Sequence, residues 1–295
     1  MFSSDDLSAP VLTRLKEMGV KYISTRSTGI DHIDIPEAGR LGLKVANIPV
    51  YSPESVAEHT LTLILSLARN IIPAYNQALI HDFTLNNLVG STIRNKTIGI
   101  VGLGKTGKAV AKILSAFGAK ILVNDIEDVS DSCLTCGARQ VSFDTILKES
   151  DIITFHVPLT DSTRHMVNEQ TISKMKDGVI LINVSRGAVF NSKDVFDKLQ
   201  DEKISKLGMD VYEFEHNVFF FNHNKNPLHD PLLKALIRHS RVLLTPHMAF
   251  LTEEALQVIA EKTISNLDLW EADKCVGEAC HCGKECISLP KALSA

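Results

Sequence analysis

A glycine-rich turn between two apolar segments constrains the fold more than any other feature of this 295-residue chain. The β-branched run that ends at Val101 leads directly into Gly102-Leu103-Gly104-Lys105-Thr106-Gly107, and a helix-forming stretch follows from Lys108 to Phe117. In such a turn the first glycine permits the tight bend, the second lets a pyrophosphate approach the backbone, and the third allows the helix to pack closely on the strand. The phosphates would bind to N–H groups at the helix N-terminus.

An acidic residue stands where a dinucleotide site needs one. Asp125 ends the next apolar run, about 20 residues after the last glycine of the turn. A carboxylate there hydrogen-bonds the ribose 2′-OH of NAD and repels the 2′-phosphate of NADP. Because strand, turn, helix, strand and acid occur in the required order, the sequence predicts NAD as cofactor rather than a glycine turn of purely structural role.

Composition and charge exclude several classes of protein. Hydrophobic residues make up 44% of the chain and charged residues 22%, as in ordinary globular domains. The formal net charge is −4, and no cluster of lysine and arginine suggests a nucleic-acid partner. The segment Met1–Asp6 lacks the features of a signal peptide, and the apolar stretch 61–68 is too short to cross a bilayer. We therefore expect a cytoplasmic protein with no membrane partner.

Apolar strands alternate with helical stretches along the middle of the chain. Further strand-like runs lie at 151–157, 178–184, 206–211 and 241–245. Such a pattern predicts an α/β fold with a doubly wound parallel sheet that is covered on both faces. The expected domains are 1–91 (N-terminal part of a substrate domain), 92–248 (dinucleotide domain) and 249–295 (return to the substrate domain, with a cysteine-rich tail).

Three segments of the expected substrate domain have a more specific pattern. The helix expected at 52–70 is apolar on more than one face, which favours a position between domains or subunits and predicts a homodimer interface. Another helix is expected over 3–20, with Ser3 or Ser4 as its N-cap. The turn Ser27-Thr28-Gly29 follows a short strand, and its backbone donors suit a small carboxylate. An ordinary strand-to-helix loop explains that turn equally well.

Three residues that follow the last strands have the chemistry of carbonyl reduction. Arg186 can hold a carboxylate with two parallel hydrogen bonds, and His247 can give a proton to a carbonyl oxygen as hydride reaches the carbon. Glu215 can fix the tautomer of a neighbouring histidine. Taken singly, each has a plain structural explanation. Because carboxyl ends of parallel strands share one edge of the sheet, their common location favours a joint catalytic role.

Several motifs in fixed order resemble the D-2-hydroxyacid dehydrogenase family, and within it the D-lactate dehydrogenases and the vancomycin-resistance type. They are Arg26-Ser-Thr-Gly-Ile-Asp-His-Ile-Asp34, Tyr51-Ser-Pro-Glu-Ser-Val-Ala-Glu58, the glycine turn, His156-Val-Pro158, Ile182-Asn-Val-Ser-Arg-Gly187, Gly208-Met-Asp-Val-Tyr-Glu-Phe-Glu215 and Thr245-Pro-His247. The resemblance covers residues 3–270 and implies a flavodoxin-like substrate domain beside the Rossmann domain. Family members usually start with a further strand and helix, so we expect the substrate domain to be N-terminally incomplete.

The resemblance also implies a reaction and a set of site residues. The reaction is reversible reduction of a 2-keto acid by NADH to a D-2-hydroxy acid of the lactate type, in a cleft between the domains. A binding protein with the same fold and little turnover, like the corepressor relatives, is the alternative. The implied catalytic residues are Arg186, Glu215 and His247; the NAD contacts are Gly102, Gly104, Lys105, Thr106, Gly107, Asp125, Val157, Pro158, Val184 and Asp210; and the substrate contacts are Ser27, Thr28, Gly29, Tyr51 and Arg186.

Four cysteines lie close together near the C-terminus, at positions 275, 280, 282 and 286. Cys275, Cys280, Cys282 and Cys286 could bind one zinc ion or an iron–sulfur cluster. Their spacing is not a common one for structural zinc, and they follow the last expected helix. The sequence therefore favours solvent-exposed, reduced thiols on a C-terminal extension, and no metal.

Overall fold

The computed structural model describes residues 5–129, 137–225 and 227–281. The chain forms two compact units, one made of residues 1–52 together with 251–295 and the other of residues 53–250. The second unit is the larger one and carries the glycine turn.

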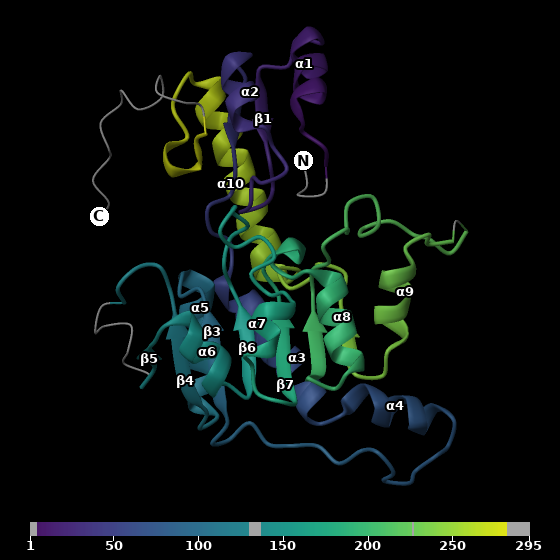
Figure 1. Ribbon diagram of the computed structural model, residues 1–295. Helices are drawn as coiled ribbons and strands as arrows, with labels where there is room; N and C mark the ends of the chain where they lie inside the picture. Colours follow the sequence, from purple (N-terminus) through teal and green to yellow (C-terminus); the bar gives the residue numbers. More distant parts are fainter. Residues whose placement is uncertain (1–4, 130–136, 226, 282–295) are drawn as a thin grey trace. The chain divides into compact units, whose positions relative to one another are not determined.

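A parallel seven-stranded sheet forms the centre of the larger unit (Figure 1). Its strand order is β5-β4-β3-β6-β7-β8-β9. The strands are β3 (Thr97–Val101), β4 (Lys120–Asn124), β5 (Arg139–Gln140), β6 (Ile152–Phe155), β7 (Val179–Asn183), β8 (Ile204–Met209) and β9 (Val242–Leu244). After β3 the chain builds outward to β5 and then returns to place β6 on the other side of β3. Dinucleotides bind at such a reversal, outside the carboxyl ends of the strands.

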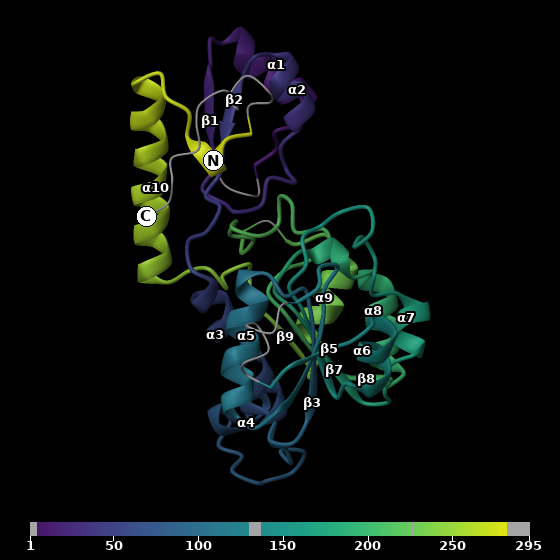
Figure 2. The ribbon, with the colours of Figure 1, turned by 90° about the vertical axis from the view of Figure 1, so that its left-hand side faces the viewer.

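Both faces of this sheet carry helices, as Figure 2 shows with α3 and α5 on one side and α6, α7 and α8 on the other. Alternate strand residues feed two separate cores: Ile98 and Ile182 lie in one, Phe155 and Leu181 in the other. This double coverage confirms the predicted doubly wound fold. The helices are α3 (Pro53–Ala68), α5 (Lys105–Ala116), α6 (Phe143–Glu149), α7 (Glu169–Ser173), α8 (Ser192–Gln200) and α9 (Pro231–Arg238).

Helix α3 is closely packed against β8. A Cβ atom at Gly208 would lie 2.8 Å from Ile182 Cδ1, 3.0 Å from Leu67 Cδ1 and 3.4 Å from Leu63 Cβ. The absence of this atom in glycine allows the helix to approach the strand closely. The sequence predicts residues 53–91 in the substrate domain and the apolar helix at 52–70 between domains or subunits. In the structure, α5 and the sheet cover the buried apolar residues of α3. Packing within the larger unit therefore accounts for the apolar faces of this helix, and they are no argument for a dimer interface.

Residues 70–91 form an arm of the larger unit, and the two ends of the arm lie side by side. Helix α4 (Ile71–Leu79) has no buried residue. The two ends of the arm are held together because Asn70 Nδ2 donates to Val89 O at 2.9 Å and Ser91 N donates to Ala68 O at 2.8 Å.

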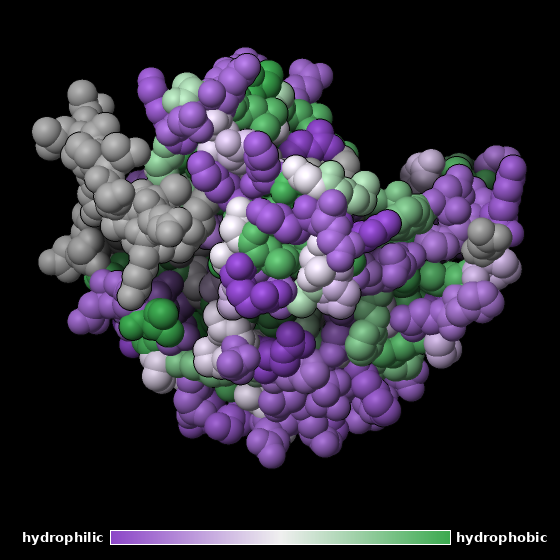
Figure 3. All heavy atoms as spheres, turned by 90° about the horizontal axis from the view of Figure 1, so that it is seen from above, coloured by the Kyte–Doolittle hydropathy of each residue, from purple (hydrophilic) through white to green (hydrophobic). Residues whose placement is uncertain are grey.

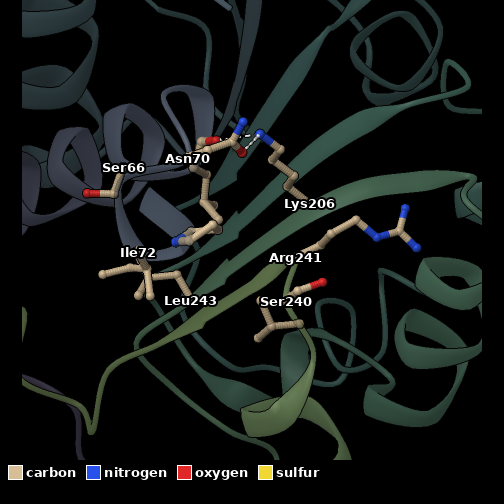
Figure 4. A pocket seen from close by; sticks show the side chains of 10 residues that line it. Ser66, Asn70, Ile72, Lys206, Ser240, Arg241 and Leu243 are labelled. Atoms are coloured by element: carbon tan, nitrogen blue, oxygen red, sulfur yellow. Dashed lines mark hydrogen bonds between the residues drawn. The ribbon is translucent and has the colours of Figure 1, made fainter. Parts of the chain in front are cut away.

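The turn between α3 and α4 is fixed by a lysine from the sheet. Lys206 Nζ donates to Leu67 O and to Asn70 Oδ1, both at 2.6 Å, beside a pocket at the amino ends of β8 and β9 (Figure 4). Burial lowers the pKa of the Lys206 ammonium. Since a cation at a helix C-terminus is favourable, this lysine acts as a cap for α3.

The smaller unit is built around two parallel strands, β1 (Tyr22–Ser24) and β2 (Lys44–Ala46). Its helices are α1 (Ala9–Glu17), α2 (Ile35–Arg40) and α10 (Glu253–Glu271), and the Tyr22 ring stacks on Trp270 of α10 at 4.9 Å. The helix expected over 3–20 is shorter than predicted, and residues 1–4 lie outside the described part. It begins at Ala9 because the Leu7 backbone bonds with His32 and Asp34.

The chain after α10 pairs with β2. Asn47 N donates to Ala279 O at 3.1 Å and His281 N donates to Val45 O at 2.9 Å, so the segment up to His281 runs antiparallel to β2. Cys275 and Cys280 are half-buried, and the expectation of an exposed extension is wrong for these two. Cys282 and Cys286 lie outside the described residues.

Two observations concern the surface. On the face seen in Figure 3, hydrophilic side chains predominate and hydrophobic ones form separate groups, a mixture that is normal for globular proteins. Among the helices of the described residues, none is both long and apolar enough to cross a membrane.

Candidate active site

The site residues that the sequence predicts in the larger unit follow successive strands of the sheet. The glycine turn follows β3, and Asp125 follows β4. Val157 and Pro158 come after β6, and Val184 and Arg186 come after β7. Asp210 and Glu215 come after β8, and His247 comes after β9. In the order of the strands, the residues expected at the adenosine end of the cofactor thus lie on one side of β6 and the expected catalytic residues on the other.

The glycine turn has the geometry that a pyrophosphate requires. Gly102 has a φ of 91°, and a Cβ at Gly107 would lie 2.1 Å from Gly102 O, so neither position accepts a side chain. A Cβ at Gly104 would meet no atom within 4 Å, which leaves open space next to the backbone. Lys105 and Thr106 form the first turn of α5 behind it. These residues fit a bound NAD.

Asp125 lies at the turn, as the sequence predicts. Its Oδ2 accepts a hydrogen bond from Leu103 N at 2.5 Å, and its Oδ1 accepts one from Glu127 N at 3.0 Å. The carboxylate is half-buried. These bonds fix it next to the glycine turn, where the ribose of a dinucleotide lies.

The segment after β6 brings a neutral histidine close to the glycine turn. A Cβ at Gly102 would lie 2.8 Å from His156 C and O, so His156-Val157-Pro158 is in contact with the turn. His156 Nε2 lies 2.9 Å from Thr154 Oγ1, and burial lowers the pKa of His156 to about 3. No cation therefore forms at this histidine near neutral pH.

The turn that carries Arg186 is held from two sides. Asn183 is buried at the end of β7; its Nδ2 donates to Arg186 O at 2.9 Å, and its Oδ1 accepts from Ser185 N at 3.1 Å. A Cβ at Gly187 would lie 2.1 Å from Tyr212 C, so this turn packs directly on the backbone after β8. The 3-10 turn η2 (Gly187–Val189) follows. The position of Arg186 is thus coupled to the segment that carries Glu215.

Glu215 and His247 form the pair that the sequence predicts. His247 Nδ1 lies 2.7 Å from Glu215 Oε1, and the other carboxylate oxygen of Glu215 accepts from Tyr212 N at 2.9 Å. Both side chains are largely buried, with 17% and 24% of the His247 and Glu215 side chains exposed. Since the carboxylate accepts, Nδ1 carries a proton, and Nε2 is the nitrogen that faces away from Glu215.

Asp210 is bound within the protein to a degree that the sequence did not indicate. Its side chain is fully buried; Oδ1 accepts from Thr245 Oγ1 at 2.6 Å and Met248 N at 2.9 Å, and Oδ2 accepts from Ala249 N at 2.8 Å. The carboxylate therefore holds the turn around His247. The part of Asp210 in binding NAD stays a prediction.

The predicted substrate residues of the smaller unit lie after β1. Ser27 Oγ donates to Gly29 O at 2.7 Å, and Asn47 Nδ2 donates to Thr28 O at 2.7 Å. Thr28 is exposed, and Tyr51 is half-buried. The turn is thus well ordered by its own hydrogen bonds.

Sequence reasoning missed the residues that support the site. Asn183, Thr245 and His59 of α3 each bond to a segment that carries a predicted catalytic residue. The signals in the sequence were weak: a polar residue that ends an apolar strand, and a histidine on an otherwise apolar helix face.

For the cysteines, no group of three metal-binding side chains occurs within the ranges that the structure describes.

Comparisons with known proteins agree with this geometry. The model of the D-isomer specific 2-hydroxyacid dehydrogenase NAD-binding domain matches residues 61–249. D-lactate dehydrogenase of Escherichia coli K12 is 41% identical over 280 residues, which cover 95% of this chain and 84% of that protein.

Two solved structures show the same fold. The pyruvate reductase of Chlamydomonas reinhardtii has a TM-score of 0.88 at 40% identity, and the match covers 94% of this chain and 84% of that one. D-lactate dehydrogenase of Aquifex aeolicus, complexed with NAD and lactic acid, has a TM-score of 0.85 at 36% identity, with 92% and 82% covered. The chain therefore belongs to the D-isomer-specific 2-hydroxyacid dehydrogenases, which are NAD-dependent oxidoreductases that interconvert 2-keto and 2-hydroxy acids.

Proposed function

We propose that this enzyme reduces pyruvate, or a 2-keto acid of similar size, to the D-2-hydroxy acid. The single observation that carries the proposal is the 2.7 Å contact between His247 Nδ1 and Glu215 Oε1 in the larger unit. This contact fixes one ring nitrogen and leaves Nε2 as the proton donor. The substrate is inferred from the names of the relatives, among them a pyruvate reductase and D-lactate dehydrogenases.

In the proposed mechanism, each residue has a separate task. NADH, when bound along the glycine turn, supplies the hydride for the keto carbon. His247 Nε2 gives its proton to the carbonyl oxygen, and Glu215 stabilises the charged imidazole before that transfer. Arg186 holds the substrate carboxylate through its planar guanidinium. In the oxidation direction His247 takes the hydroxyl proton back.

A turnover assay tests this proposal. Purified enzyme with NADH is given pyruvate, 2-ketobutyrate, 2-ketoisocaproate and phenylpyruvate, and the product is resolved by chiral chromatography. We expect the D-product and the highest kcat/KM for the smaller acids. His247→Ala should lower kcat by roughly 10²- to 10⁴-fold, the contribution of general acid catalysis, while NADH still binds. Absence of turnover with every acid, or an L-product, would contradict the proposal.

We also propose that the enzyme is a cytoplasmic homodimer. The support for the dimer is the arm of residues 70–91. Ile71, Tyr75 and Leu79 lie four residues apart on one face of α4, and 51%, 61% and 62% of their surfaces are exposed. Phe83 and Leu85, which follow α4 in the arm, are exposed as well. A second copy of the chain is its proposed partner, because an exposed apolar surface of this extent marks an interaction site.

Light scattering at micromolar concentration tests the dimer. The wild-type enzyme should have twice the mass of the chain, and Tyr75→Glu together with Leu79→Glu should halve it. Lys112→Glu, which changes an exposed residue of α5, serves as the control and should leave the mass unchanged. A monomeric wild-type protein would contradict the dimer without affecting the proposed reaction.

A further inference from the structure

His59 lies beneath the turn that carries His247. Its Nε2 atom is 3.0 Å from Thr245 Oγ1 and 3.5 Å from Asp210 Oδ1, although 186 residues separate His59 from Thr245. Only 15% of the His59 side chain is exposed. This histidine therefore connects helix α3 with the ends of β8 and β9.

The hydrogen bonds assign the proton on His59. Thr245 Oγ1 has one proton, and its 2.6 Å contact with Asp210 Oδ1 requires that this proton point to the carboxylate. The hydroxyl oxygen must then accept from His59, so Nε2 carries a hydrogen. The same N–H group faces Asp210 Oδ1. The N–H group of a histidine therefore lies next to a fully buried carboxylate.

The His247 turn needs this support because its backbone is strained. His247 has a φ of 53°, in the left-handed region that residues with a side chain rarely adopt. Asp210 holds the strained conformation: its carbonyl oxygen accepts from His247 N at 2.7 Å, and its carboxylate accepts from Met248 N and Ala249 N. A shift of that carboxylate would move the catalytic imidazole.

Helix α3 supplies a rigid base for His59. Leu63 lies one helical turn after His59 in α3. Leu63 and Leu67 both pack against Gly208, a residue of β8 that stands two positions before Asp210. Because backbone and helix touch at this glycine, the distance between His59 and the Asp210 carboxylate is set by close packing rather than by a flexible loop.

We propose that His59 is a positioning residue of this dehydrogenase: its Nε2–H group fixes Thr245 and Asp210 and thereby holds His247 in place for proton transfer. This inference rests on the proposed role of His247 as the proton donor. Misplacing a catalytic group by about 1 Å can cost roughly 100-fold in rate.

Two substitutions separate the donor from the bulk of the ring. His59→Leu removes the N–H group, whereas His59→Gln retains an N–H donor at a similar reach from the backbone; both residue types favour helices. Thr62→Ala on the exposed side of α3 is the matched control. Steady-state rates with pyruvate and NADH, the isotope effect with deuterated NADH, and the thermal midpoint are measured for each variant.

The expected result is a change in kcat without a matching change in KM. His59→Leu should lower kcat roughly 10- to 100-fold, with KM for pyruvate within about 3-fold of the wild-type value and a larger isotope effect. The kcat of His59→Gln should stay within about 3-fold of the wild-type value, and the kcat of Thr62→Ala should equal that of the wild type. Wild-type kcat in His59→Leu, or an equal loss in His59→Gln, would overturn the inference.

A double-mutant cycle and a spectroscopic measurement complete the test. Thr245→Val removes the hydroxyl that links His59 to Asp210, so adding His59→Leu should cost little more; additive losses would contradict the link. If the wild-type enzyme turned over no keto acid, the proposed function would fail, but the ring signal of His247 in NMR would still report its position. That signal should shift in His59→Leu and not in His59→Gln, and an unchanged signal in both would overturn the inference.

Discussion

Glu215 Oε1 lies 2.7 Å from His247 Nδ1, although 32 residues separate the two in the chain. The contact forms because β8 and β9 are adjacent and parallel, so the segments that follow them leave the sheet side by side. A carboxylate on one and an imidazole on the other then meet at the carboxyl edge, where ligands of such sheets bind.

Replacing the charge of Glu215 should slow the proton transfer. Glu215→Gln keeps the shape of the side chain but no longer stabilises the positive imidazole, so we expect kcat to fall by about 10²-fold, the lower limit for losing a general acid. NADH affinity, measured by fluorescence, should stay the same. Unchanged turnover would show that Glu215 does not act on His247.

Arg186→Lys should chiefly weaken substrate binding. An ammonium cannot reproduce the planar fork of the guanidinium, and one lost charge-assisted hydrogen bond corresponds to a rise of roughly 10- to 100-fold in KM for the keto acid. Arg238→Lys, at an exposed position at the end of α9, is the control. Equal KM values in both variants would remove Arg186 from the substrate site.

The enzyme should prefer NADH to NADPH because of Asp125. Its carboxylate is held at the glycine turn by Leu103 N, where it repels a 2′-phosphate. We expect a higher kcat/KM with NADH, and Asp125→Ala should reduce that preference while Asp128→Asn, an exposed neighbour, leaves it intact. A higher kcat/KM with NADPH in the wild-type enzyme would contradict the role of Asp125.

His156 should make the fold sensitive to acid. Burial lowers its pKa from 6.5 to about 3, so the unfolded chain takes up a proton first as the pH falls. As far as His156 is concerned, the free energy of unfolding is highest above pH 6.5 and falls progressively between pH 6.5 and pH 3. At pH 5 the loss should reach about 2 kcal/mol. Urea unfolding at pH 7 and pH 5 checks this.

The control for that measurement is His156→Gln, which keeps a polar atom near Thr154 Oγ1 but does not titrate. Its free energy of unfolding should fall less between pH 7 and pH 5 than that of the wild-type protein. Equal losses in the two proteins would mean that the acid sensitivity comes from other groups.

Local sequence patterns predicted the sheet and the glycine turn because the interactions that form them are local. The turn needs glycine at Gly102 and Gly107 for steric reasons that hold in any protein with this geometry. The strand β5 was missed, since two residues cannot form an apolar run. Helix α1 was predicted too long because the Leu7 backbone bonds with a segment about 25 residues further along.

The supports of the catalytic residues were not predictable in the same way. Nothing in the sequence near Asp210 indicates that its carboxylate binds Thr245, Met248 and Ala249, because these contacts arise only once β8 and β9 pair. The exposed arm was equally hard to predict. Its apolar residues resemble those of a core helix, and only the structure shows that α3 already fills the space against the sheet.

The arm of residues 70–91 has its two ends joined by the Asn70–Val89 and Ala68–Ser91 hydrogen bonds. A segment that departs and returns at one point behaves as an insertion: its length and composition can diverge during evolution without changing the register of the sheet. The arm and the catalytic residues are then encoded in separable parts of the gene. A protein engineer can replace the arm while the chemistry at the opposite edge of the sheet is left as it is.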